Sequence, residues 1–271
     1  MAIDEQRGSA EPVRGPRAST AVKVVQLVEL LAARRESLGV REVSRDTGLD
    51  KSAVSRLLDQ LTQLGIAEQS QVTGRYYAGP RLFALGATVH ARDTLWQAAE
   101  PILRSLVTRF NETCYLAIRD GDYVVFRDKV DCDHYIRYVI SADERSPLHA
   151  GAGGRAVLAG IPEAECESVL ARLTLTKLTA NTITDRAELV RQVAEDRRRG
   201  YSVSMGERVA EGSAVAAPFH LPDGSCRGAV VLTCPAVRFD VRRVPEIADA
   251  VLGAGHSLSS RVGYHPEAPS R

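Results

Sequence analysis

The residues of this sequence best suited to binding chemistry are short polar and basic side chains on one side of a predicted helix. Between residues 51 and 64 the apolar positions recur at i, i+3, i+4, i+7 and i+10, which predicts one buried face. The opposite face carries Ser52, Ser55 and Arg56. Such side chains near a helix N-terminus can reach base edges in a DNA major groove, where arginine can bind both acceptors of guanine.

Basic residues near this helix would add contacts to phosphates, which hold the protein on DNA without reading its sequence. We expect these contacts from Lys51, Arg41 and Arg45, from Arg75 in a following hairpin, and from Arg17 in an N-terminal arm. The alternative is that these residues form the solvated face of an ordinary helical bundle. The neighbouring elements, described below, favour DNA binding.

A second candidate site is the glycine-rich segment at residues 147–159 (PLHAGAGGRAVLA). It lacks the Gly-Lys-Ser/Thr of a nucleotide loop, and no G-x-G-x-x-G follows a strand. A helix that begins with small residues lets a ligand approach the backbone N–H groups, and the positive helix end suits a carboxylate. The alternative, that the small residues only let the helix pack closely, stays open.

Catalytic chemistry has no comparable group of residues. No G-x-S-x-G occurs, and His149 has no obvious nucleophile beside it. The pair Cys132 and His134 supplies two potential metal ligands rather than a site. We therefore predict no catalytic residues, no metal site and no cofactor. The five cysteines show no C-x-x-C spacing, which indicates reduced thiols.

The elements around the first candidate site follow a recognisable order. A first helix begins near Ser19, a second spans residues 40–47 and ends at Gly48, and Asp50 is a good cap for the third. Residues 66–68 and 75–78 read as short strands of a hairpin. Helix, helix, tight turn, helix and hairpin form a winged helix-turn-helix, which we place at residues 18–79 after a disordered arm at 1–17.

The rest of the chain predicts a linker helix at residues 80–94, a second domain at 95–263 and a disordered tail at 264–271. In the second domain, helices and hairpin-connected strands indicate an α+β fold on a largely antiparallel sheet. Strands are expected near residues 113–119, 123–126, 135–139, 201–204, 213–219 and 228–233. Helices are expected near residues 101–110, at the glycine-rich entry 147–159, and near 162–173, 185–199 and 241–260.

Length and composition agree with two soluble domains. The chain has 271 residues, 44% of them hydrophobic, and a formal net charge of +1. No window approaches the roughly 20 apolar residues that span a bilayer, and the N-terminus resembles no targeting signal. We expect a cytoplasmic protein that does not bind membranes. Because the net charge is near zero, any case for nucleic acid must come from local charge and motifs.

Two halves of the chain resemble one protein family. Residues 49–65 (LDKSAVSRLLDQLTQLG) and 76–86 (YYAGPRLFALG) resemble the N-terminal domain of the IclR family of bacterial transcription regulators. Residues 147–159, with further matches at 183–185, 199–202, 216–218, 234–235 and Arg238, resemble landmarks of its effector domain. The resemblance implies a winged helix-turn-helix, a linker helix and a GAF-like effector-binding domain, assembled as dimers or dimers of dimers on double-stranded DNA.

The resemblance also implies an effector pocket. Gly151 and Ala152 would form its floor, Ile136 and Tyr138 one wall, and Ser204, Ala214, Val231 and Thr233 its remaining contacts. Relatives often carry an acidic residue, a cysteine and two serines at the last four positions. This less polar set predicts a larger, partly apolar effector, such as an aromatic or alicyclic acid. Glu207 matches an acidic residue of the family, and a structural role for it stays open.

These features together predict a ligand-responsive regulator, a repressor of a catabolic operon that senses a small organic acid. A homodimer or homotetramer would bind a palindromic operator. The alternative is a small-molecule sensor or enzyme whose N-terminal helices contact proteins. A salt series discriminates between them, because phosphate contacts make DNA affinity fall steeply with salt.

Overall fold

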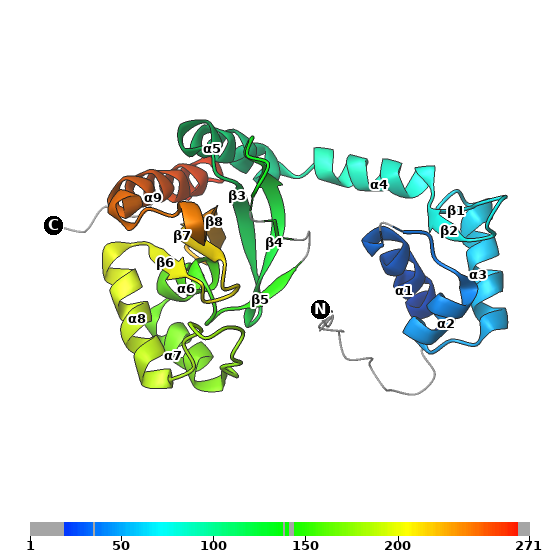
Figure 1. Ribbon diagram of the computed structural model, residues 1–271, viewed down its shortest axis with the longest axis horizontal. Coiled ribbons are helices and arrows are strands. Elements are labelled where there is room, and N and C mark those ends of the chain that lie inside the picture. The colour runs from blue at the N-terminus through cyan, green and yellow to red at the C-terminus, as the bar shows by residue number, and fades with distance from the viewer. Residues whose placement is uncertain (1–18, 35, 138, 141–143, 265–271) are drawn as a thin grey trace. The chain divides into compact units, whose positions relative to one another are not determined.

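The computed structural model describes residues 19–34, 36–137, 139–140 and 144–264. The predictions for the N-terminal arm with Arg17, for Tyr138 and for the tail beyond Tyr264 lie outside the described residues. The chain divides into two compact units, residues 1–92 and 93–271 (Figure 1). In the described residues, no helix is both long and apolar enough to cross a membrane.

The N-terminal unit has the predicted order of elements. It consists of α1 (Thr20–Ala33), α2 (Val40–Thr47), α3 (Lys51–Gln63), β1 (Ala67–Gln69), β2 (Tyr76–Ala78) and α4 (Pro80–Ala91). The predicted caps are confirmed: Ser19 accepts a hydrogen bond from the Val22 amide, and Gly48 ends α2 with φ of 68°. An antiparallel bridge between Leu38 and Tyr76 lies beside the β1–β2 hairpin.

The apolar face of α3 is buried in the core of this unit. Val54 and Leu58 are fully buried among residues of α1 and α2, and Tyr76 of the wing packs on the same cluster. Burial of a leucine side chain contributes about 1.5–3 kcal/mol, so this face determines how α3 is oriented. The polar face of α3 consequently points to solvent.

The second unit is built on a six-stranded, fully antiparallel sheet, which confirms the α+β prediction. The sheet order is β5-β4-β3-β8-β7-β6. The strands are β3 (Cys114–Asp120), β4 (Tyr123–Val130), β5 (Arg145–Pro147), β6 (Ser202–Met205), β7 (Gly212–His220) and β8 (Cys226–Pro235).

Helices cover both faces of the sheet (Figure 1). Alternation along β3 separates two cores: Cys114 and Leu116 pack towards α5 and α9, whereas Tyr115 and Ala117 pack towards α6. The helices are α5 (Thr94–Phe110) and α9 (Val244–Arg261) on one face, and α6 (Ala152–Gly160), α7 (Glu163–Arg172) and α8 (Arg186–Arg199) on the other.

Four details differ from the sequence predictions. The strand expected at residues 135–139 is wrong, because its described residues pair with no strand and Tyr135 and Ile136 are exposed. The edge beside β4 is taken by β5, which was not predicted. The final helix begins at Val244 after two short 3₁₀ turns, Ala236–Arg238 and Val241–Arg243. The predicted linker helix ends at Ala91, and Asp93 caps α5.

Candidate functional site

The exposed face of α3 presents two cations. Lys51 and Arg56 are exposed, and neither forms a hydrogen bond or ion pair with any residue that the structure describes. Ser55 lies beside them and is half-buried. Gln60, one turn beyond Arg56, is exposed on the same side of the helix. The sequence analysis did not single out Gln60, although its i+4 spacing from Arg56 could have identified it.

Asp50 fixes the start of α3. Its carboxylate accepts hydrogen bonds from the Ser52 hydroxyl at 2.6 Å and the Ala53 amide at 2.8 Å. These two bonds hold the pKa of Asp50 below its usual value of 3.8. Because the Ser52 hydrogen is donated within the turn, Ser52 is left with acceptor lone pairs for any outside donor.

Helix α2 adds two cations next to α3. Arg41 is exposed and has no hydrogen bond or ion pair among the described residues. Arg45 makes a long 3.4 Å contact with the adjacent Asp46, and its side chain is largely exposed. An exposed pair of this kind contributes little, so the guanidinium remains accessible to an external anion.

Arg75 has an anchoring role, and its phosphate contact stays a prediction. Its guanidinium donates to the Ser37 carbonyl at 2.6 and 3.1 Å, to the Ser37 hydroxyl at 3.0 Å, and to Glu42 at 2.7 Å. These bonds join the wing to the start of α2. The Gly39 amide and Arg75 lower the pKa of Glu42. Sequence spacing could not reveal this, because the partners lie 33 and 38 residues away.

A cavity in the second unit brings together six of the eight predicted effector residues: Gly151, Ala152, Ser204, Ala214, Val231 and Thr233. Tyr138 lies outside the described residues. Ile136 is not part of the wall, since its side chain is 74% exposed and no strand forms there. The buried residue at the wall is Ile140, whose amide donates to the Tyr115 hydroxyl at 2.8 Å.

The cavity is small and mostly apolar. Its volume is about 30 Å³, enough for about two water molecules. Cavities that hold benzene are on the order of 150 Å³, so a ring-sized ligand must widen this one. The hydroxyls of Ser204, Ser213 and Thr233 add polar groups to the lining.

Both readings of the glycine-rich segment are supported at different residues. A Cβ on Gly154 would lie 2.5 Å from the Leu148 carbonyl oxygen, so this glycine is needed for close packing. Gly151 and Gly153 line the cavity instead. Gly151 has φ of 91°, a conformation that favours glycine.

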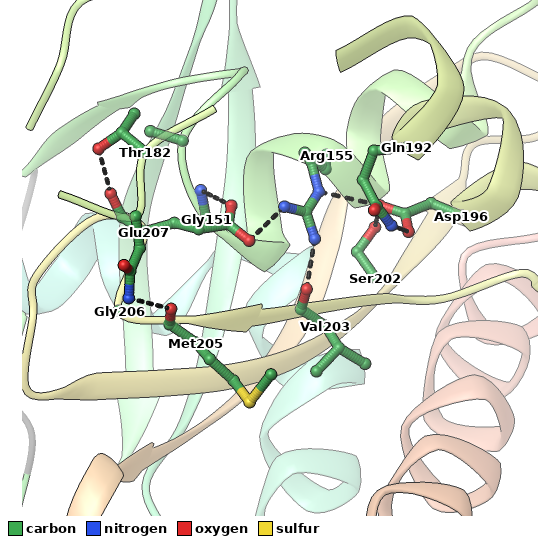
Figure 2. A network of polar contacts seen from close by, with 12 residues as sticks. Gly151, Arg155, Thr182, Gln192, Asp196, Ser202, Val203, Met205, Gly206 and Glu207 are labelled. Carbon is green, nitrogen blue, oxygen red and sulfur yellow. Dashed lines mark hydrogen bonds and ion pairs between the residues drawn. The ribbon is translucent and has the colours of Figure 1, made fainter. Parts of the chain in front are cut away.

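Figure 2 shows a buried ionic network that reaches Gly151, one of the residues that line the cavity. Arg155 donates to Asp196 at 3.0 Å, to Glu207 and to the Val203 carbonyl. The second Glu207 oxygen accepts the Gly151 amide at 3.1 Å. Glu207 therefore has a structural role, and it binds one of the backbone N–H groups at the helix start that the sequence analysis expected an effector to approach.

Asp196 extends the network into α8. It accepts hydrogen bonds from the Ser202 hydroxyl at 2.6 Å, the Gln192 amide at 2.9 Å and Arg199 at 2.6 Å. Buried charges are stable only when paired and hydrogen-bonded in this way. The network thus ties the cavity floor to α8.

Arg208 is a lining residue that the sequence analysis missed. It forms an ion pair with Glu144, and its guanidinium carbon lies 5.0 Å from the centre of the Phe126 ring. Among the described residues that line the cavity, Arg208 is the one with a positive charge. Because Arg208 follows Glu207 in the sequence, it could have been considered as a lining residue. Whether its side chain reaches the cavity depends on the path of residues 206–211.

Comparisons with known proteins agree with both units. The model of the IclR helix-turn-helix domain matches residues 20–71, and that of the bacterial transcriptional regulator IclR C-terminal domain matches residues 87–260.

Individual proteins match over most of their length. The HTH-type transcriptional regulator BhcR of Paracoccus denitrificans is 29% identical, over 92% of this chain and 89% of its own. The HTH-type transcriptional repressor AllR of Escherichia coli K12 is 28% identical over 96% of both. The crystal structure of an IclR homologue from Microbacterium hydrocarbonoxydans, complexed with 4-hydroxybenzoate, has the same fold, with a TM-score of 0.77, 24% identity and coverage of 90% and 99%.

Proposed function

Because the chain belongs to the IclR family of bacterial transcriptional regulators, we propose that it is a repressor whose DNA binding responds to a small organic acid. The relatives named above are transcriptional regulators rather than enzymes. This counts against the alternative of an enzyme with protein-binding helices. A regulator of this family acts on the bacterial chromosome, so we place it in the cytoplasm.

The observation that carries DNA recognition is the pair of exposed cations on α3, which have no hydrogen-bond or ion-pair partner among the described residues. We assign base contacts to Ser52, Ser55 and Arg56, and phosphate contacts to Lys51, Arg41 and Arg45. Lys51 and Arg56 need break no ion pair with a residue that the structure describes in order to bind DNA. A mobility-shift assay on the DNA upstream of the gene tests this: affinity should fall steeply as salt rises. Weak binding to this DNA at every salt concentration would contradict the proposal.

The proposed oligomer rests on two features: the exposed apolar side chains of α4 and the two-fold symmetry of palindromic operators. None of the residues of α4 is buried, although Phe83, Leu85 and Val89 are large and apolar. Leu85 and Val89 share one face of the helix, and exposed large apolar side chains of this kind mark protein–protein contacts. We propose a homodimer through α4, or a homotetramer built from it, on a palindromic operator.

The proposed effector is an aromatic or alicyclic acid. Apolar lining from Phe126, Ile140 and Val231 suits a hydrocarbon body, and Arg208 supplies a cation. The Microbacterium homologue was crystallised with 4-hydroxybenzoate, so this acid is the first to test. Calorimetry against glyoxylate, pyruvate and aromatic acids should give tighter binding of the aromatic acids. Tight binding of only glyoxylate or pyruvate would contradict it.

The repressor assignment and the catabolic role are tested together. AllR is named a transcriptional repressor, and the same sign of regulation is proposed here. Deletion of the gene should raise transcription of an adjacent catabolic operon, and the acid that binds the protein should do the same in the wild type. A fall in transcription after deletion would indicate an activator.

A further inference from the structure

Arg155 and Arg208 both lie near the start of α6, and their carboxylate partners differ in exposure. Arg155 has a side chain 1% exposed, and its partners Asp196 and Glu207 have side chains 0% and 10% exposed. Because both carboxylates are buried, neither can leave the guanidinium for water at low cost, so Arg155 is locked in place. Arg208 is 12% exposed, but its partner Glu144 is 40% exposed. Glu144 can return to water at low cost, because an exposed ion pair contributes little.

Arg208 lies where an incoming anion would meet two favourable charges. An ideal Cβ on Gly151 would come within 3.5 Å of the Arg208 Cβ, so Arg208 stands beside the start of α6. The first amides of a helix have no partner within it, and the helix dipole makes this end positive. The Gly151 amide is already bonded to Glu207. Arg208 is therefore the strongest anion ligand that the described cavity lining offers.

We propose that Arg208 binds the carboxylate of the effector, which replaces Glu144 as its ion-pair partner. This inference rests on the proposed function, since it requires that the cavity takes an organic acid. The ligand class is a monocarboxylate with an aromatic or alicyclic body. The body contacts Phe126 and Val231, and the carboxylate lies between Arg208 and the first turn of α6.

The exchange makes Arg208 a specificity determinant. A carboxylate can accept two parallel N–H bonds from a guanidinium, and charge-assisted bonds are about twice as strong as neutral ones. A neutral amide of the same shape offers one carbonyl oxygen and no charge. It would either leave the ion pair with Glu144 in place or break that pair without supplying another charge. The cavity should therefore discriminate acids from their amides.

Calorimetry on the full-length protein tests this with three acids and their amides: 4-hydroxybenzoate, benzoate and cyclohexanecarboxylate. We expect the wild type to prefer each acid that it binds over the matching amide. Arg208→Met should weaken acid binding on the order of 10- to 100-fold, the value of a charge-assisted hydrogen bond, and leave amide binding unchanged. Glu144→Gln should tighten acid binding several-fold, because it removes the competing charge.

The matched control is Arg145→Met. Arg145 also pairs with an exposed aspartate, Asp120, at 2.9 Å, and lies 4.8 Å from the centre of the Tyr123 ring, but it does not line the cavity. The Arg145→Met variant should bind each acid with the same affinity as the wild type.

Each remaining outcome is informative. Equal acid affinity in the wild type and Arg208→Met would overturn the role of Arg208 and leave the effector class intact. Unchanged acid affinity in Glu144→Gln would overturn the exchange, and this variant decides the matter if Arg208→Met does not fold. If the wild type binds none of the three acids, the proposed effector class fails, and this inference fails with it.

Discussion

At the scale of single residues, Arg56 is the side chain on which sequence-specific recognition depends most. It is exposed on the outer face of α3 and forms no ion pair within the described chain. If it binds a guanine edge, Arg56→Ala should cost about 1–3 kcal/mol on the operator and much less on random DNA. Competitive mobility-shift titrations on both DNAs measure the difference. Equal losses on both would reduce Arg56 to a phosphate contact.

Arg41 is the matched comparison on α2. Since a phosphate contact carries no base information, Arg41→Ala should weaken binding to both DNAs alike. It should also reduce the slope of log affinity against log salt by about 1. A selective loss on the operator would instead place Arg41 at a base edge.

The wing depends on a residue pair with a defined pH response. The Gly39 amide and Arg75 lower the pKa of Glu42 from its ordinary value of 4.5. A carboxylate with a lowered folded pKa stabilises the fold fully above its unfolded pKa, and this contribution is lost as the pH falls through the folded value. Glu42→Gln should thus have a lower Tm than the wild type at pH 6, and the gap should shrink towards pH 3.5. Thermal melts measured by circular dichroism check this, and a pH-independent gap would contradict it.

At the scale of elements, alanine substitutions at two glycines of α4 should change the stability of the N-terminal unit in opposite directions. Gly79 comes just before the helix, and Gly86 lies inside it. A Cβ on Gly79 would lie 2.3 Å from the Gly65 carbonyl oxygen and 2.8 Å from that of Ala67. Gly79→Ala should therefore destabilise the N-terminal unit by about 1–3 kcal/mol, as overpacking does.

Gly86 lies inside α4 with nothing within 4 Å of its ideal Cβ. Gly86→Ala should stabilise the same unit by about 0.5–1 kcal/mol, because alanine loses less conformational freedom in a helix. Urea denaturation of both variants measures the pair. A loss of stability in Gly86→Ala would show that this position is covered by another chain.

The elements that could be predicted from the sequence are those specified by residues close together along the chain. The cap at Asp50, the stop at Gly48 and the apolar spacing of α3 are local signals, and all three are confirmed. The strand expected at residues 135–139 failed because an apolar run forms a strand only where a sheet edge pairs with it. Local sequence could not reveal that β5 takes this edge.

The residues of the candidate site also divide into those that the sequence could indicate and those that depend on distant contacts. Six lining residues were found through family resemblance, because it places them on the floor and walls of one pocket. The roles of Arg155 and Arg208 depend on partners 41–64 residues distant in sequence. Those contacts exist only after folding, so spacing along the chain does not contain them.

At the scale of the whole molecule, the central question is how two recognition helices are paired. A palindromic operator needs two copies related by a two-fold axis, and each copy must bury a self-complementary surface. Helix α4 offers exposed apolar side chains for such a surface, with Val89 on one face and Phe83 on another. An aspartate at either position would place a charge in the interface, where desolvation without a partner is costly.

Phe83→Asp should accordingly shift the protein towards monomer and weaken operator binding, since each half-site is then bound independently. Sedimentation velocity measures the first effect, and mobility-shift assays measure the second. Val190→Asp makes the same chemical change at an exposed valine of α8 and should leave dimerisation intact. A Phe83→Asp protein that remains dimeric at micromolar concentration would exclude this face of α4 as the dimer contact, and the pairing would then have to come from the sheet-based unit.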